Sequence, residues 1–378
     1  MEDPAQSKSN IGRSILWMIV IAVVLVGGYP LTKQKGAVEM KVGIIAPSTG
    51  NFAVFGERMR RGFEMAKEDL LKGGAIDSLE LIYEDACQPK DAVSAVQKLI
   101  TVNHIQVLGG SFCVIGFVPS IPILEENKIL TFNTAPNPDD ALNKKYVVST
   151  NSSIQEKASQ LATFARETLN AKTVAVIYYN TPLGKDYEKY FSLTFTQKGG
   201  EVVSSELTLV DATDFRTPLT KIKAKNVDVI FVVQLASPLG NLLKQARELG
   251  IKASILGNSQ NEDPTIIDTA GKAAEGFLIS SDEPFPKTNT ITDFEKRFFA
   301  KYNQKPDVYA TNSYDALTIQ VEAFKKCKGD TECMLVEARA IKNYPGVSGV
   351  ITIKPDGSAS KSTTFKVVRN GAFVPFER

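Results

Sequence analysis

The feature that most constrains the fold is an alternation of apolar runs with segments of helical spacing, repeated along most of the chain. The first run, MKVGIIAP (40–47), is continuously apolar, as expected of a strand buried on both faces. A segment of helical spacing follows at 55–71, with Phe55, Met59 and Phe63 recurring at intervals of four. Further strands are expected at 79–85, 105–110, 128–134 and 146–150, with helices at 89–102 and 118–127. The alternation predicts a parallel sheet covered by helices on both faces.

A second series of the same kind begins with a helical segment at 154–169. Strands are expected at 173–179, 201–209, 227–233, 253–257 and 276–281, separated by helices. Further helices are expected at 291–303, 313–326 and 332–342. The last two stretches, 349–358 and 362–376, contain Asp-Gly and Asn-Gly turns and predict β-hairpins. With 378 residues, the chain is long enough for two domains. The expected fold class is therefore α/β, with two doubly wound, Rossmann-like lobes.

An apolar segment precedes the first strand. Between Arg13 and Lys33 lie 19 uncharged residues, about the length of a helix that spans a bilayer. Two interpretations compete: an uncleaved membrane anchor, which the full span favours, and a cleaved signal peptide. Basic residues before the segment favour an N-terminus on the inside and an exported remainder. We therefore expect a short cytoplasmic N-terminus at 1–13, an anchor or signal peptide at 14–32 and a linker at 33–38.

Four cysteines follow the apolar segment. An exported chain lies where disulfides persist. The spacings contain no C-x-x-C and the only histidine is His104, so no zinc site or other metal is expected. Cys327 and Cys333 flank the turn KGDTE and are natural partners, which leaves Cys87 and Cys113 as the other pair. Other connectivities, or four reduced cysteines in a cytoplasmic protein, remain alternatives.

Charge and motifs exclude several functional classes. Lysine and arginine exceed the acids by only two, 44 − 42, so no nucleic-acid partner is expected. No glycine-rich phosphate loop follows the first strand of either series, so no nucleotide cofactor is expected. The stretch GNSQN (257–261) has no histidine after it, unlike a hydrolase elbow. The loops after the strands are rich in small, hydroxyl and amide residues, which is typical of a site for a polar small molecule.

Four stretches carry a resemblance to a known family: KVGIIAPSTGNFAVFGERMRRGFEMA (41–66), EDACQPKDAVSAVQKLI (84–100), AEGFLIS (274–280) and SYDAL (313–317). They are similar to type 1 periplasmic binding proteins of the branched-chain amino acid (Leu/Ile/Val-binding) class of ABC uptake systems. The resemblance covers about 39–378. It implies a protein, not an enzyme, that captures a small amphipathic solute between two lobes and delivers it to an ABC permease in the membrane. A ligand-sensing ectodomain or an orphan binding protein is the alternative.

The resemblance also implies how the chain is divided and placed. The hinge between the lobes is expected to be crossed three times, near 150–154, 282–286 and 345–348. The first lobe would comprise 39–152 and 285–346, and the second lobe 153–284 and 347–378. Some members have a disulfide at the positions of Cys87 and Cys113. The protein is expected to be a monomer without cofactors, extracytoplasmic and tethered to the cell membrane, or secreted or periplasmic after signal cleavage.

Seven positions match the family's amino-acid site: Phe55, Val114, Ala135, Asn137, Leu183, Leu235 and Ser259. In the family a serine holds the α-carboxylate, a threonine touches both ends of the ligand and a glutamate accepts from the α-ammonium. Here these positions are Val114, Asn137 and Ser259. A register shift of one or two residues would instead put Glu262 or Asp263 in the place of the acid.

The remaining matched positions are apolar. Three family tyrosines that line and close the cleft fall on Phe55, Leu183 and Leu235, and Ala135 keeps the small residue of the family. The resemblance therefore implies a cleft that is more apolar and less charged than the family's. We expect a neutral or singly charged amphipathic ligand, and only weak binding of free leucine, isoleucine and valine.

Overall fold

The first β-α-β series folds into a five-stranded parallel sheet with the strand order β2-β1-β3-β4-β5. In the middle of its core, Met40, Val42 and Ile44 of the apolar run 40–47 are completely buried. This burial is the reason for the continuous apolar pattern. The strands are β1 (Glu39–Ile45), β2 (Ser78–Glu84), β3 (Val107–Ser111), β4 (Leu130–Asn133) and β5 (Val147–Ser149).

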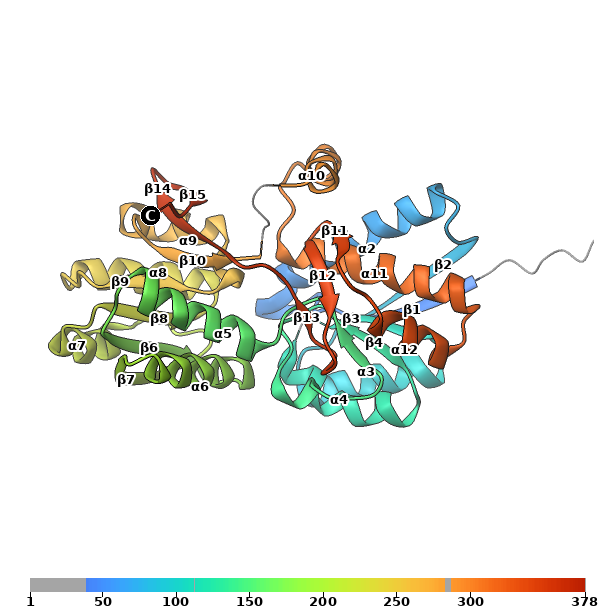
Figure 1. Ribbon diagram of the computed structural model, residues 1–378, viewed down its shortest axis with the longest axis horizontal. Helices are drawn as coiled ribbons and strands as arrows, with labels where there is room; N and C mark the ends of the chain where they lie inside the picture. Colours follow the sequence, from blue (N-terminus) through green and yellow to red (C-terminus); the bar gives the residue numbers. More distant parts are fainter. Residues whose placement is uncertain (1–38, 112, 283–286, 378) are drawn as a thin grey trace, which may run out of the picture. The chain divides into compact units, whose positions relative to one another are not determined.

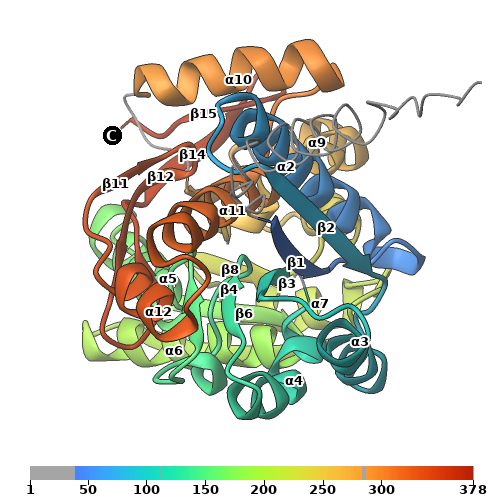
Figure 2. The ribbon, with the colours of Figure 1, turned by 90° about the vertical axis from the view of Figure 1, so that its right-hand side faces the viewer.

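Helices cover both faces of this sheet. One apolar cluster joins β1, β3 and β4 to α2 (Ala53–Lys72), α11 (Val308–Cys327) and α12 (Thr331–Arg339). A separate cluster on the opposite face contains α3 (Pro89–Thr101) and α4 (Val114–Glu126). Figure 2 shows α2 and α11 on one side of the sheet and α3 and α4 on the other. We call this unit the first lobe.

The second series forms a seven-stranded sheet with the order β15-β14-β10-β9-β8-β6-β7. Five strands are parallel, and β14 and β15 form an antiparallel hairpin on β10. Its strands are β6 (Thr173–Tyr179), β7 (Glu201–Thr208), β8 (Val229–Val233), β9 (Ser254–Gly257), β10 (Leu278–Ser281), β14 (Thr364–Arg369) and β15 (Ala372–Pro375). We call the unit on this sheet the second lobe; Figure 1 shows its strands apart from those of the first sheet.

The second sheet is also covered on both faces. On one face lie α5 (Ile154–Thr163), which continues as the π-helical turn Phe164–Thr168, and α6 (Pro182–Gln197). The other face is covered by α7 (Arg216–Lys225), α8 (Ala236–Glu248) and α9 (Pro264–Ala270). The remaining helical elements of the described residues are α10 (Asn289–Tyr302) and the 3-10 turns Gly50–Phe52, Asp139–Ala141, Ser259–Asn261 and Gly271–Ala274.

The two predicted hairpin stretches separate in the structure. Residues 364–375 form the hairpin β14–β15, and Asn370 and Gly371 both have positive φ, as a type I′ turn requires. The earlier stretch joins a small antiparallel sheet of β11 (Tyr344–Gly346), β12 (Gly349–Ile353) and β13 (Ala359–Ser360). Because Ile351 and Ile353 pack in the core of the first lobe, the chain returns to the second lobe after Ser360. The resemblance had instead placed the return of the chain to the second lobe at residue 347.

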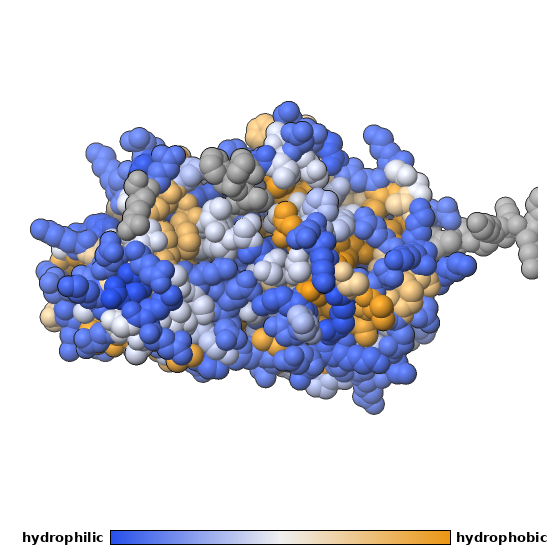
Figure 3. Space-filling model, in the orientation of Figure 1, coloured by the Kyte–Doolittle hydropathy of each residue, from blue (hydrophilic) through white to orange (hydrophobic). Residues whose placement is uncertain are grey.

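This computed structural model describes residues 39–111, 113–282 and 287–377. The expected N-terminal segments at 1–13, 14–32 and 33–38 lie outside that range. Residues from 39 onward form one compact unit. Within the described ranges, none of the helices combines the length and the apolarity needed to cross a bilayer. The face in Figure 3 is mostly hydrophilic, with smaller hydrophobic areas between the charged residues.

Two disulfides join the four cysteines, in the pairing that the sequence favoured. Cys87, in the loop after β2, is bonded to Cys113, just after β3, with the two Cα atoms 5.2 Å apart. Cys327 is bonded to Cys333 across the turn between α11 and α12, with Cα atoms 5.6 Å apart. The first disulfide ties together two loops at the carboxyl edge of the first sheet, the edge on which ligands of such sheets bind.

Candidate functional site

A small cavity lies between the two lobes at the carboxyl ends of their strands. Its volume is about 70 Å³, well below the roughly 300 Å³ or more of small-molecule sites. The first lobe contributes Phe52, Phe55, Cys87, Cys113, Val114, Ile115 and Tyr309. The second lobe contributes Tyr179, Thr181, Pro182, Leu183, Val210, Gln234, Leu235, Ala236 and Gln260. Because the space is so small, the lobes must separate to admit a solute.

Four of the seven matched residues line this cavity: Phe55, Val114, Leu183 and Leu235. A fifth, Ala135, is buried in the same apolar cluster as Val114 and Leu183. That cluster is otherwise the core of the second lobe, so the side chains of the first lobe close directly onto it. The structure thus brings together the apolar part of the site expected from the sequence.

The two polar matched residues, Asn137 and Ser259, are not among the residues that line the cavity. Asn137 is fully buried beside the hinge, and its Oδ1 accepts a hydrogen bond of 2.8 Å from Asn133 Nδ2. The Oγ of Ser259 donates to Asp282 Oδ2 at 3.1 Å and accepts from Lys157 Nζ at 3.3 Å. The Ser259 side chain therefore serves the protein's own hydrogen-bond network, whereas Nδ2 of Asn137 has no hydrogen-bond partner among the residues that the structure describes.

Three acids lie near position 259, and each is neutralised by a cation of the protein. Asp282 contacts Lys157 Nζ at 2.5 and 2.6 Å. Asp263 contacts Arg58 at 2.7 Å, and Glu262 is paired with Lys366. Although burial disfavours the charged form of Asp282, the Lys157 ammonium holds its pKa below the ordinary value. Each of the three carboxylates therefore already has a cationic partner in the protein, although Arg58 also pairs with Asp307.

Three buried tyrosines near the cavity were missed by the sequence reasoning. Tyr179 ends β6 and Tyr309 lies in the first turn of α11, and both line the cavity. Tyr187 lies one helical turn after Leu183 in α6 and is completely buried. Burial raises the pKa of all three phenols, so each stays neutral at physiological pH. Neutral hydroxyls can donate to or accept from a polar solute.

Sequence signals for two of these tyrosines existed. Tyr179 is the last residue of the predicted strand 173–179, at the edge where ligands bind. Tyr309 was overlooked because α11 was expected to begin at 313, whereas it begins at Val308. The N-cap there is Asp307, which accepts from the backbone N–H groups of Tyr309 and Ala310. An aspartate before an apolar helical pattern is a start signal.

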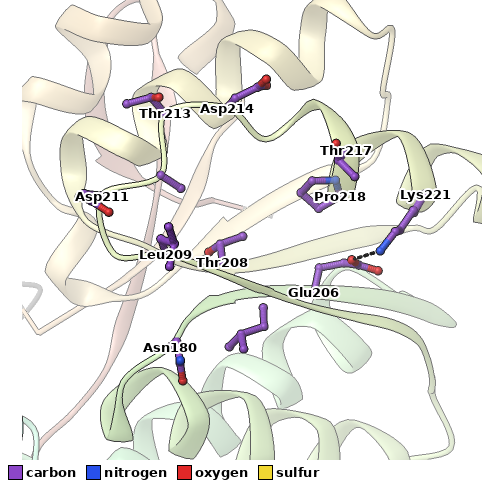
Figure 4. Close-up of a pocket in the computed structure, with 12 residues that line it drawn as sticks. Asn180, Glu206, Thr208, Leu209, Asp211, Thr213, Asp214, Thr217, Pro218 and Lys221 are labelled. Carbon is purple, nitrogen blue, oxygen red and sulfur yellow. Dashed lines mark hydrogen bonds and ion pairs between the residues drawn. The ribbon is translucent and has the colours of Figure 1, made fainter.

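A larger groove lies entirely on the second lobe, with a volume of about 580 Å³. Figure 4 shows it between the end of β7 and the start of α7, with an ion pair between Glu206 and Lys221 at 2.9 Å. Its rim includes Leu209, which is 68 % exposed. The next residue, Val210, lines the cavity between the lobes. The groove is thus a separate feature from that cavity, although the two share a loop.

Two α/β lobes, joined by several chain crossings and closed over a cavity at the ends of their strands, define a solute-binding protein. The sequence profile of the periplasmic binding protein family matches residues 39–372. The chain belongs to this family.

Individual relatives agree with this assignment. The Leu/Ile/Val-binding protein homolog 3 of Brucella melitensis is 26 % identical over 349 residues, which cover 90 % of this chain and 94 % of that protein. The leucine-, isoleucine-, valine-, threonine- and alanine-binding protein of Pseudomonas aeruginosa is 24 % identical, with 85 % and 87 % covered. The crystal structure of a leucine-binding protein from Thermotoga maritima superposes with a TM-score of 0.82 at 25 % identity, with 89 % and 98 % covered.

The predicted class is therefore confirmed: the fold is that of a type 1 periplasmic binding protein, and the protein binds a solute. The family implies an extracytoplasmic location. It is a class of solute-binding proteins rather than of enzymes, and the alternative of a ligand-sensing ectodomain is not favoured.

Proposed function

We propose that this protein captures a small amphipathic solute, with at most one charge, between its lobes and delivers it to an ABC permease. The similar binding proteins are named for leucine, isoleucine and valine, and one of them also for threonine and alanine. The proposal therefore begins from a solute with an aliphatic body of about the size of these side chains. The apolar wall of Phe55, Val114, Leu183 and Leu235 fits such a body.

The observation that carries the restriction on charge is the pairing of the three acids near position 259. A zwitterion in a closed cleft loses most of its water, so each of its charges needs a good partner. Here Asp263 and Asp282 already bind Arg58 and Lys157. The position of the family's serine is Val114, which has no hydroxyl. Each missing hydrogen bond to a charged group costs about 1.5–3 kcal/mol.

The proposed ligand contacts are the seven matched residues, Phe55, Val114, Ala135, Asn137, Leu183, Leu235 and Ser259. The apolar five would hold the body of the solute. Asn137 and Ser259 would meet its polar tip only if the open cleft exposes them, because both are buried in the structure described here. Tyr179 and Tyr309 line the cavity directly and are additional candidates for the polar tip.

We further propose that residues 14–32 tether the protein to the outer face of the cell membrane. The support is the uncharged span between Arg13 and Lys33 and the basic residues before it. A tether of this kind would keep the binding protein beside its permease, so that delivery does not depend on diffusion through a larger volume.

The charge restriction can be tested with four probes of matched shape. Leucine is zwitterionic, 4-methylpentanoate lacks the ammonium, isoamylamine lacks the carboxylate and 4-methylpentanol is neutral. Thermal shifts of the full chain are measured with each, because a ligand at 1,000 times its dissociation constant adds about 4 kcal/mol of stability. We expect at least one of the last three to shift the melting temperature more than leucine does. A leucine shift that is the largest at micromolar concentration would overturn the restriction.

A further inference from the structure

Arg58 contacts carboxylates of both lobes. It lies in α2 of the first lobe, three residues after Phe55. Its Nη1 is 2.7 Å from Asp263 Oδ2, at the start of α9 in the second lobe. Its Nε is 3.2 Å from Asp307 Oδ2, at the start of α11 in the first lobe. One guanidinium therefore links the first turns of two helices that belong to different lobes.

Both carboxylates are held in place by helix N-termini, independently of Arg58. Asp263 caps α9, with Oδ1 accepting from Thr265 N at 2.9 Å. Asp307 caps α11, with Oδ1 accepting from Tyr309 N and Ala310 N at 3.0 Å. Each aspartate thus uses one oxygen for its helix and the other for Arg58. Charge-assisted bonds between groups fixed in this way cost little side-chain entropy.

The contact lies directly beside the solute cavity. The guanidinium carbon of Arg58 is 5.6 Å from the ring centre of Phe55, and the rings of Phe55 and Tyr309 are 5.2 Å apart. Both aromatic side chains line the cavity. The aromatic wall of the cavity therefore packs directly against Arg58. A solute that contacts Phe55 and Tyr309 can in this way affect the position of the Arg58 side chain.

We propose that Arg58 and Asp263 form a latch that holds the lobes closed and thereby sets the affinity for the solute. This inference rests on the proposed function, because it assumes that closure captures the solute. When the lobes separate, Asp263 moves away with the second lobe and Arg58 keeps Asp307. Opening therefore breaks one charge-assisted bond without leaving Arg58 unpaired. The contact between Arg58 and Asp263 therefore favours the closed form, and the lobes can still open because only this one bond is lost.

A second contact between the lobes serves as an internal comparison. Asp139 of the first lobe binds Lys189 of α6 at 3.1 Å and also the hydroxyl of Tyr190. The side chains of Lys189 and Asp139 are 57 % and 36 % exposed, whereas those of Arg58 and Asp263 are 22 % and 4 % exposed. Exposed ion pairs contribute little because water and salt screen them. Loss of the Lys189 charge should therefore change closure much less than loss of the Asp263 charge.

The test measures the distance between the lobes without any solute. Spin labels are attached to cysteines introduced at two exposed positions, Val54 in the first lobe and Lys272 in the second, and the distance distribution is recorded in the full chain. Asp263→Asn is the main variant, because asparagine still caps a helix but lacks the charge. Asp307→Asn and Lys189→Met are the controls. The first leaves the contact between Arg58 and Asp263 in place, and the second removes the exposed ion pair between the lobes.

We expect Asp263→Asn to broaden the distribution toward longer distances, with the ratio of open to closed molecules raised about tenfold, as for the loss of one hydrogen bond to a charged group. Lys189→Met should resemble the parent, and Asp307→Asn should not shift the distribution toward longer distances. An unchanged distribution in Asp263→Asn, or an equal change in Lys189→Met, would overturn the latch. Since no solute is present, these outcomes do not depend on the charge restriction tested with the four probes.

A second measurement links the latch to binding. The probe that gives the largest thermal shift among the four is titrated against the parent and Asp263→Asn, with melting curves to show that the variant is folded. We expect a higher dissociation constant in the variant, by a factor smaller than the tenfold change in the ratio of open to closed molecules, because the parent already favours closure without solute. An equal dissociation constant, with the distance distribution changed, would show that closure does not set affinity and would overturn that half of the proposal.

Discussion

The hydroxyl of Ser259 donates a hydrogen bond of 3.1 Å to Oδ2 of Asp282, a carboxylate that Lys157 already neutralises. The resemblance led us to expect the family's ammonium-binding glutamate at position 259, whereas the Ser259 side chain contacts a buried ion pair. The pair connects α5, just after the first crossing between the lobes, to the end of β10 at the second crossing.

Ser259→Glu is therefore expected to destabilise the protein rather than to create a leucine site. The new carboxylate would lie in a buried environment beside Asp282, which already uses the charges of Lys157 and Lys361. We expect the free energy of unfolding to fall by more than about 2 kcal/mol, against about 1 kcal/mol for the matched Ser259→Ala. Urea unfolding of both variants measures this. A stable Ser259→Glu protein that binds leucine at micromolar concentration would contradict the expectation.

Lys361 makes the stability depend on pH. It is completely enclosed at the third crossing, with Nζ donating to Asn312 Oδ1 at 2.6 Å and to Ser348 Oγ at 2.5 Å. Burial outweighs the attraction of Asp315 and Asp282 and lowers the pKa of Lys361 to about 8. Between pH 8 and the unfolded pKa near 10.4, the unfolded chain therefore binds more protons than the folded protein.

The free energy of unfolding should consequently rise with pH in that window, by about 1.4 kcal/mol for each pH unit from this group alone. Below pH 8 the lysine is charged in both states, so its contribution becomes constant. The measurement is urea unfolding at pH 7 to 10 of the parent and Lys361→Met, and the difference between the two cancels the other titrations. A difference that does not change with pH would show that Lys361 has an ordinary pKa.

The two disulfides should contribute unequally. The bridge Cys87–Cys113 closes a sequence separation of 26 residues and Cys327–Cys333 one of 6. In the chain-entropy model these loops correspond to about 3.5 and about 2.2 kcal/mol. We expect double alanine variants to lose stability in that order. Peptide mapping without reduction should find both linked pairs in protein from its own cells, and freely alkylated cysteines there would contradict the exported location.

The architecture was predictable from the sequence because burial on both faces of a parallel strand leaves a pattern that no surface segment has. The run 40–47 and the strand 173–179 are examples. The position of the small sheet at 344–360 was not predictable, because the sequence pattern of a hairpin does not indicate which lobe the hairpin packs against. Ile351 and Ile353 face the core of the first lobe, and only the tertiary contacts reveal this.

The candidate site was predictable only in its apolar part. A resemblance to a family predicts where a backbone segment lies in the fold. For Val114 and Leu183 this is enough to predict that the side chain lies at the cavity. The resemblance does not predict hydrogen-bond partners, which come from distant segments: Ser259 is held by Asp282 and Asn137 by Asn133. Tyr309 reaches the cavity from a helix far along the chain; the start signal at Asp307 indicates the helix, but no local pattern indicates that Tyr309 reaches the cavity.

Membrane topology is testable by proteolysis of spheroplasts. If residues 14–32 anchor an outward-facing domain, protease should release the folded unit from residue 39 onward, and Met1–Asn10 should stay with the membrane fraction. An N-terminal epitope tag and an antibody against the folded unit follow the two pieces. Protection of the folded unit in intact spheroplasts would mean that the orientation is reversed. Loss of the N-terminal piece from mature protein would indicate signal cleavage.

Tyr187 gives a prediction that separates stability from binding. Its hydroxyl is buried and, among the residues that the structure describes, has no hydrogen-bond partner. It lies one turn after Leu183, which lines the cavity, and burial together with the negative charge of Asp282 raises its pKa. An unpaired buried hydroxyl costs about 1–3 kcal/mol, so such a group in a folded protein calls for an explanation, and a ligand that bonds to it is one.

Tyr187→Phe should therefore raise the melting temperature of the solute-free protein, because the variant removes the unsatisfied hydroxyl without changing the packing of the ring. The same variant should weaken binding of the best of the four probes by roughly tenfold if the polar tip of the solute bonds to this hydroxyl. Tyr190→Phe is the control, because Tyr190 bonds Asp139 and does not line the cavity. It should lower stability slightly and leave binding unchanged. If Tyr187→Phe is stabilised and binds the probe as tightly as the parent, the polar tip is met elsewhere, and Tyr179 and Tyr309 become the residues to test.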